Sequence, residues 1–125
     1  MAEDALTFSE LRKIQKRESR QDELTELDDD FVLKVADYLE TKKEVSGESR
    51  EYRNAKRVFD KIIGLREEKI VKNARLAVKS GVDASELNLL PTEKQLFLDM
   101  KTEFGSHHER LDDRLDSGMV ETPDL

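Results

Sequence analysis

One long, strongly basic stretch of predicted helix, residues 49–80, most limits what this chain can fold into. Lysine and arginine outnumber aspartate and glutamate there, although the whole chain of 125 residues carries a net charge of -7. A helix of about thirty residues is roughly 45 Å long at 1.5 Å per residue, which exceeds the diameter of a compact domain of this size. Part of it therefore lacks cover from its own chain, which favours an assembly module over an enzyme.

Composition excludes several classes of protein. With 41% charged residues, 36% hydrophobic residues and two prolines, the sequence is typical of a mostly helical protein. It contains no cysteine, which excludes disulfides, thiolate metal sites and a cysteine nucleophile. No apolar stretch approaches the roughly 20 residues that cross a bilayer, and the first residues lack the apolar segment of a secretory signal. We therefore expect a cytoplasmic location and no membrane contact.

Two shorter helices are predicted before the long one. Thr7 and Glu10 match a capping box, which predicts a helix over residues 8–20. A second helix is expected to begin at the aspartates 28–30, because carboxylates favour the positive end of a helix, and to end near Gly47. Its apolar residues fall on one face at helical spacing: Phe31, Val32, Val35, Ala36 and Leu39.

The long helix has one apolar side and ends at a glycine. The residues that share this side at 100° per residue are Tyr52, Ala55, Phe59, Ile62, Ile63, Ile70, Ala74 and Ala77. Gly64 lies inside the helix, where it indicates a slight bend or a close helix crossing. Gly81 is the expected stop.

The remaining sequence predicts a fourth helix and a short fifth one. Pro91 suits the first position of the fourth helix and Gly105 its end, while Ser106 and Glu109 match a second capping box that opens a helix to about Asp116. The predicted fold class is all-α, an elongated helical bundle with one long central helix. We expect a helical domain over residues 1–105, then a short helix and a flexible acidic tail over 106–125.

Arg66 lies within the apolar side of the long helix, and Asn73 sits close to the same line. A buried guanidinium is costly unless it is paired and hydrogen-bonded, so we expect a carboxylate from another helix beside it. Two interpretations stay open: a fixed ion pair at an interface, or an arginine that reaches water at the edge of the bundle.

A row of cations covers one arc of the same helix, about 100° wide at 3.6 residues per turn. This basic face consists of Arg50, Arg53, Arg57, Lys61, Lys72, Arg75 and Lys79. This face could bind the phosphates of a nucleic acid, bind an acidic surface of a partner protein, or simply be exposed to solvent. No aromatic residues interleave it, which argues against stacking on single strands.

Two leucines, Leu33 and Leu98, point away from the apolar faces of their helices and are candidate partner contacts, although scattered exposed leucines are normal. The adjacent His107 and His108 have no third ligand at metal-site spacing. Carboxylate pairs arise by chance at this charge density, and no glycine-rich phosphate loop occurs. The sequence predicts no catalytic, metal or cofactor site.

The order of four segments resembles the helical domain of archaeal GINS subunits. These segments are ELRKIQKRE (10–18), DDFVLKVADYLE (29–40), YRNAKRVFDKIIGLREEKIVKNARLA (52–77) and LLPTEKQLFLDM (89–100). The resemblance covers nearly the whole chain up to about Phe104. Each motif is helical, charged and individually unspecific, so their order carries the resemblance.

The resemblance implies a non-enzymatic scaffold in DNA replication that associates with the nucleoid. GINS is a four-subunit assembly in the replicative helicase complex, where it acts with the MCM helicase and, in archaea, associates with a RecJ-like protein. The expected partners are sister GINS subunits, in a homo- or hetero-oligomer, together with those two proteins. Arg66 and Lys69 fall in the segment LREEK, for which the resemblance implies a structural or interface role.

One departure from the family and two rival functions stay open. GINS subunits have a helical A domain and a small β-rich B domain, and nothing after Leu125 supplies the latter, so either this chain is the A domain alone or the B domain is absent from this homologue. The first rival is a helical nucleic-acid-binding protein that contacts DNA weakly through the basic face. The second is a coiled-coil dimer, although Arg66 and Asn73 interrupt the required seam.

Overall fold

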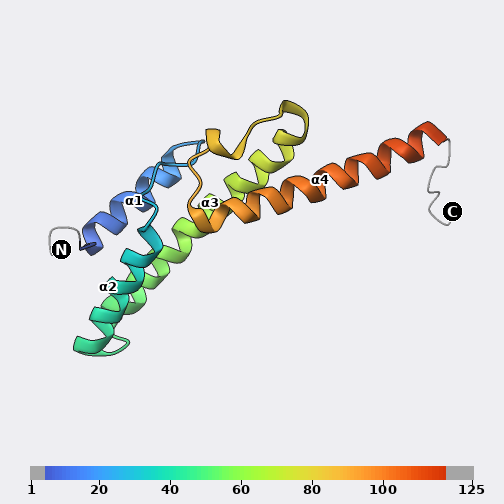
Figure 1. Cartoon of the computed structure of the whole chain (residues 1–125). Coiled ribbons are helices and arrows are strands. Elements are labelled where there is room, and N and C mark those ends of the chain that lie inside the picture. Colours follow the sequence, from blue (N-terminus) through green and yellow to red (C-terminus); the bar gives the residue numbers. More distant parts are fainter. Residues whose placement is uncertain (1–4, 118–125) are drawn as a thin grey trace.

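The computed structural model describes residues 5–117 as an elongated all-α bundle around one long helix. The central helix α3 (Arg50–Ser80) is contacted by α1 (Phe8–Arg20), by α2 (Phe31–Ser46) and by α4 (Pro91–Ser117). Figure 1 shows α2 along the first part of α3, and α4 crossing α3 and continuing beyond it. This architecture confirms the predicted fold class.

Local sequence signals determine where the helices begin and end. The capping box of α1 is present: the Glu10 N–H donates to the Thr7 hydroxyl (3.1 Å), and the Thr7 N–H donates to the Glu10 carboxylate (3.2 Å). At the start of α3 the Ser49 hydroxyl accepts from the Tyr52 N–H (3.3 Å). Gly81 ends α3 in the left-handed conformation, with φ 73°.

Helix α2 buries a narrower face than its sequence predicts. Phe31 and Val35 are buried, whereas Val32 is 36% exposed and Ala36 is also exposed. The helix packs on α3 alone, so only one narrow arc of its surface is covered. Val32 and Ala36 lie about 100° and 140° around the helix from Phe31, at the edge of that arc.

The predicted break at Gly105 is wrong. A single helix, α4, runs from Pro91 to Ser117, and the separate helix predicted from Ser106 to Asp116 is the second half of it. Gly105 has no positive φ, and one internal glycine costs only about 1 kcal/mol relative to alanine, which the helix formers on either side outweigh. Residues 118–125 of the predicted flexible tail lie outside the described part of the chain.

Two apolar clusters lie one after the other along α3. The first contains Ile62, with Leu11, Phe31, Val35, Ala55 and Leu90. The second contains Ile70, with Leu24, Ala74, Ala77, Leu89 and Phe97. Arg66 stands between Ile62 and Ile70 on the same side of α3, so a buried cation divides the core. A short 3-10 turn (Ala84–Glu86) links α3 to α4 beside the second cluster.

Gly64 lies in the middle of α3 with open space around it. No atom beyond its own helix lies within 4 Å of the position that a Cβ would take. A close helix crossing, one of the two alternatives drawn from the sequence, is therefore wrong.

We predict that Gly64→Ala raises the free energy of unfolding by about 1 kcal/mol, because alanine costs less conformational entropy in a helix and fits here without a clash. Denaturation by urea, followed by circular dichroism, measures this change. Gly81→Ala is the matched control: at φ 73° an alanine is strained, so this variant should be less stable than the wild type. A destabilised Gly64→Ala variant would contradict the prediction.

Candidate functional site

The most unusual feature of the molecule is a buried charged network at the centre of α3. The side chain of Arg66 is completely buried, and the carboxylates of Glu18 from α1 and Glu93 from α4 lie against it. These two glutamates are the carboxylates from other helices that the buried guanidinium requires. We call Arg66, Lys69, Glu18, Glu93 and Thr25 the Arg66 network.

All five N–H groups of the Arg66 guanidinium find acceptors. Nε and Nη2 donate to the two oxygens of Glu93, each at 2.9 Å. Nη1 donates to Glu18 Oε1 (2.7 Å) and to the backbone carbonyl of Thr25 (2.9 Å). Nη2 also donates to the carbonyl of Asn88 (2.7 Å). The planar fork of arginine thus binds four segments at once: α1, the α1–α2 linker, the loop before α4 and α4 itself.

Lys69 completes the network from the next turn of α3. Its Nζ donates to Glu18 Oε2 (2.5 Å) and to the backbone carbonyls of Glu18 (2.7 Å) and Glu23 (3.0 Å). The hydroxyl of Thr25 donates to Glu18 Oε1 (2.7 Å). Lys69 therefore fixes the end of α1 and the loop that follows it, while Arg66 fixes the start of α4.

The charges of the network balance: two cations, Arg66 and Lys69, face two carboxylates, Glu18 and Glu93. No buried side-chain nitrogen or oxygen among the described residues lacks a hydrogen-bond partner. Desolvation offsets much of the attraction within a buried ion pair, so such networks contribute more to the uniqueness of an arrangement than to stability. Here the network joins Glu18 of α1 and Glu93 of α4 to the same residue of α3.

The network also shifts two pKa values. Burial alone would raise the pKa of Glu18, but hydrogen bonds from Lys69, Thr25 and Arg66 outweigh it and hold this pKa below its usual value. Burial likewise opposes the charged form of Arg66, yet its bonds to Glu93 and Glu18 raise its pKa above the ordinary value. Both groups are therefore charged in the folded protein at neutral pH.

Asn73, grouped with Arg66 by the sequence analysis, lies outside the network. Its side-chain amide donates to the backbone carbonyl of Lys69 (2.8 Å), one turn earlier in α3. It also lines a small surface hollow together with Glu23 and Leu87. The position of Asn73 near the buried side of α3 is therefore explained by a bond within its own helix.

The network partners of Arg66 were not found from the sequence, although signals for both glutamates existed. Glu18 follows Leu11 by seven residues, so the two share a face of α1 and both are buried. Glu93 follows Leu90 by three residues and accepts from its backbone N–H (2.8 Å), as a helix-capping glutamate does. The acceptors on Thr25 and Asn88 belong to loops and carry no periodic signal.

The basic face of α3 is exposed along its whole length. Arg53 donates to the carbonyl of Glu48 (2.7 Å), and Arg57 donates to the side-chain oxygen of Asn54 (3.3 Å). No carboxylate of the described chain forms an ion pair with any of its seven cations. Glu68 lies at the same angle on the helix and separates the cations into two groups.

The two leucines singled out as candidate partner contacts are exposed, Leu33 by 63% and Leu98 by 46%. Sequence reasoning missed three further exposed leucines: Leu76 of α3, which is 48% exposed, and Leu111 and Leu115 on the second half of α4, which are 46% and 73% exposed. The mistaken helix break at Gly105 concealed Leu111 and Leu115, because it assigned them to a separate helix and not to the face of α4 that is buried in its first half.

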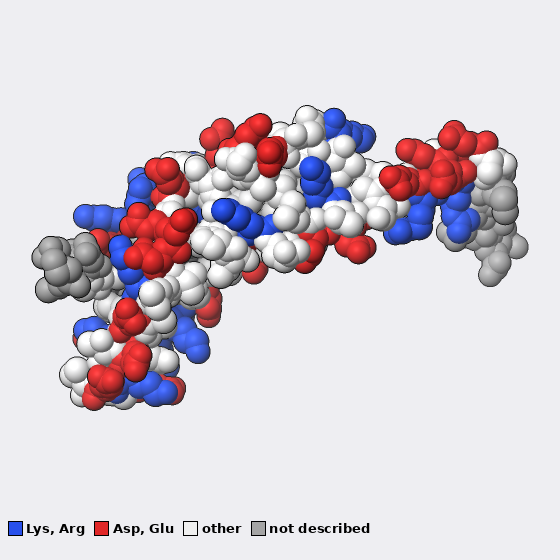
Figure 2. Space-filling model, in the orientation of Figure 1, with Lys and Arg blue, Asp and Glu red and all other residues white. Residues whose placement is uncertain are grey.

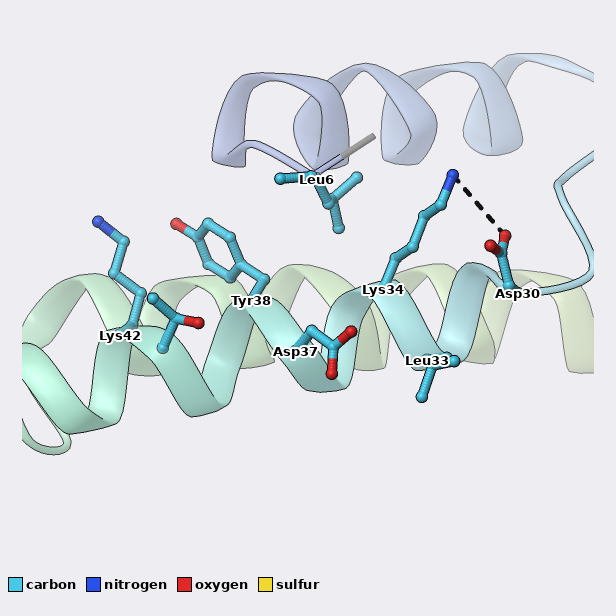
Figure 3. A pocket seen from close by; sticks show the side chains of 9 residues that line it. Leu6, Asp30, Leu33, Lys34, Asp37, Tyr38 and Lys42 are labelled. Carbon is cyan, nitrogen blue, oxygen red and sulfur yellow. Dashed lines mark ion pairs between the residues drawn. The ribbon is translucent and has the colours of Figure 1, made fainter. Parts of the chain in front are cut away.

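A shallow groove of about 470 Å³ lies between α2 and the segment that precedes α1. Figure 3 shows Leu6 above it, with Lys34 and Tyr38 on its α2 side. Lys34 forms ion pairs with Asp28 (3.3 Å) and Asp30 (3.7 Å), and Lys42 forms one with Glu51 (3.1 Å), so both cations of this groove are paired. The groove therefore offers no unpaired cation to an anionic ligand.

Residues 5–117 contain no group of three histidines, cysteines or carboxylates that could hold a metal ion. His107 and His108 have ring centroids 6.0 Å apart and lie on the outer half of α4. No helix in the same range is both long and apolar enough to cross a membrane.

We predict that Arg66→Met lowers the free energy of unfolding by about 3–5 kcal/mol, because it leaves the carboxylate of Glu93 buried without a counter-charge and that of Glu18 paired with Lys69 alone. Denaturation by urea measures this change. Arg75→Met, an exposed arginine on the same helix, should change stability by no more than about 0.5 kcal/mol. Equal effects of the two substitutions would contradict the structural role of Arg66.

We further predict an acid-labile contribution from Glu18. The pKa of an unfolded glutamate is about 4.3 and that of folded Glu18 is lower, so its contribution to stability is complete above the unfolded value. That contribution is lost as the pH falls through the folded pKa. Glu18→Gln should therefore lose less stability than the wild type between about pH 5 and pH 3, whereas the exposed Glu67→Gln should follow the wild type. Parallel curves for Glu18→Gln and the wild type would contradict this.

No protein-family model matches the chain, and neither a curated protein nor a solved structure matches it. The GINS resemblance therefore stays a prediction from the sequence.

Proposed function

We propose that this chain is a non-catalytic helical scaffold subunit that joins partner subunits through exposed helix faces. The observation that carries this proposal is the second half of α4. From Glu109 to Ser117 every residue of α4 is exposed, and Figure 1 shows this part of the helix extending beyond α3. We call residues 105–117 the arm.

The arm continues the apolar stripe by which α4 packs on the core. Phe97 is buried and Phe104 packs on the edge of the second cluster. Leu111 and Leu115 follow at spacings of seven and four residues, on the same side of the helix. The apolar stripe of α4 is thus covered by the core in its first half and exposed in its second half. This arrangement is expected of a helix whose exposed half packs against a partner protein.

Charges of opposite sign flank the bare stripe. Glu109, Asp112 and Asp116 lie on one side of it, and Arg110 and Arg114 on the other. Figure 2 shows acidic side chains on one side of the part of the molecule that extends beyond α3 and basic side chains on the other. Such segregated flanks specify the orientation of a partner helix.

Pairing of two arms of this same chain is disfavoured in both directions. An antiparallel pair related by a twofold axis sets the acidic flank of one arm against that of the other. A parallel pair brings the first half of one α4 into the place where α3 of the other copy packs. The arm is therefore better suited to a helix of a different, sister subunit.

The resemblance to archaeal GINS subunits supports a finer proposal. In it, the chain belongs to a GINS-type complex that supports the MCM helicase in DNA replication, with sister GINS subunits and a RecJ-like protein as partners. The Arg66 network would then hold the arm at the angle that the complex requires. This proposal includes no catalytic step.

A second candidate function is contact with nucleic acid through the basic face of α3. The observation that favours it is the absence of any ion pair from those seven cations among the described residues. A phosphate-binding face should lose affinity steeply with added salt. Because the chain is acidic overall, such contact would be weak and would serve the assembly rather than replace it.

We predict that Leu111→Glu combined with Leu115→Glu abolishes association with a sister subunit and leaves thermal stability unchanged. The measurement is the mass of the complex by light scattering after size exclusion, with a second GINS-type chain of the same genome as partner. Val45→Glu, another exposed apolar residue, is the control and should associate like the wild type. Association unaffected by the arm substitutions would contradict the role of the arm, and no association of the wild type would contradict the GINS proposal.

A further inference from the structure

A second groove lies between α1 and the first half of α3, and its chemistry differs from that of the groove in Figure 3. Its volume is about 430 Å³. On the α1 side it is lined by Phe8, Arg12 and Gln15. Its α3 side consists of Asn54, Arg57, Val58 and Lys61. No carboxylate lines it, although acidic residues outnumber basic ones in the chain.

The cations of this groove have no anionic partner in the described chain. Arg12, Arg57 and Lys61 form no ion pair there, and Arg57 donates to the Asn54 amide oxygen (3.3 Å). Glu51, which lies one turn before Asn54 at the start of α3, is already paired with Lys42 (3.1 Å). The positive charge of the groove is therefore uncompensated.

The walls of the groove are two helices that present the same spacing. Phe8, Arg12 and Gln15 lie at positions i, i+4 and i+7 of α1, and Asn54, Val58 and Lys61 repeat this pattern on α3. Half-buried Phe8 and Val58 supply an apolar floor. A surface of this kind accepts the side chains of a third helix, whose apolar residues one turn apart enter between the two walls.

We propose that this groove docks an acidic amphipathic helix of a partner subunit. Leucine-like side chains at i and i+4 would contact Phe8 and Val58, and carboxylates on both flanks would meet Arg12 on one wall and Arg57 and Lys61 on the other. This inference rests on the proposed scaffold function and adds to it the chemistry of one partner surface.

Charge and lining together favour a peptide over nucleic acid as the occupant. The net charge of -7 repels a long polyanion at a distance, whereas a short acidic helix brings less charge. An apolar floor between two cationic walls matches a helix with one apolar and two acidic sides. A phosphate backbone has no apolar group for that floor.

The test uses fluorescence anisotropy with three labelled probes and the full chain. The first probe is a helical peptide of about 16 residues with leucines at i and i+4 between glutamates, and the second replaces its glutamates by lysines. The third is an oligothymidine of about 16 nucleotides. Arg57→Glu combined with Lys61→Glu reverses the groove charge, and Arg75→Glu combined with Lys79→Glu is the matched control on the other half of the basic face.

The inference expects the acidic peptide to bind, with affinity that falls at least about tenfold in the groove variant and little in the control, a difference of about 1.4 kcal/mol. The lysine peptide should not bind. No binding of the acidic peptide, equal losses in both variants, or tighter groove-dependent binding of the oligothymidine would each overturn it. Retained assembly with a sister subunit in the groove variant would leave the scaffold function intact, so the two failures are distinguishable.

Discussion

The buried guanidinium of Arg66 is the constraint on which the rest of this structure depends. It divides the core of α3 into two apolar clusters, and every one of its N–H groups is bound to a group from another segment. A leucine at this position would also fill space, but it would tolerate slippage of the neighbouring helices. An arginine with five fixed acceptors does not tolerate such slippage, since any displacement leaves a buried charge or carbonyl without its hydrogen-bond partner.

The bonds of Arg66 and Lys69 also fix the positions of the surfaces that a partner would contact. Glu93 is in the first turn of α4, so its two hydrogen bonds to Arg66 fix the direction of the whole helix, including the arm that extends beyond α3. Glu18 and Lys69 fix α1 against α3 in the same way, and the groove lined by Arg12 and Lys61 lies between these two helices. A rigid centre with bare helix faces at both ends suits a scaffold, because binding then costs little ordering.

Much of the fold could be predicted from the sequence because its signals are local. The capping box at Thr7 and the left-handed Gly81 delimit α1 and α3 as expected. The sequence failed at two points for different reasons. Gly105 predicts a helix stop, yet the helix formers on either side outweigh the cost of one glycine and α4 continues through it. The buried face of α2 is narrower than predicted because α3 is the one helix that packs on it within the described part of the chain. Arg66 could be found as an anomaly in an apolar face, whereas Thr25 and Asn88, which accept from it through loop carbonyls, could not.

The most direct test of this account is the distance between α1 and α4 measured by pulsed electron paramagnetic resonance. Spin labels on cysteines introduced at the exposed Ser9 and Thr102 are unambiguous, because the chain has no native cysteine. We predict a narrow distance distribution in the otherwise wild-type protein. In Arg66→Lys, which keeps the charge but loses the fork, the distribution should broaden while helix content persists. An equally narrow distribution in Arg66→Lys would contradict the claim that the guanidinium sets the arrangement.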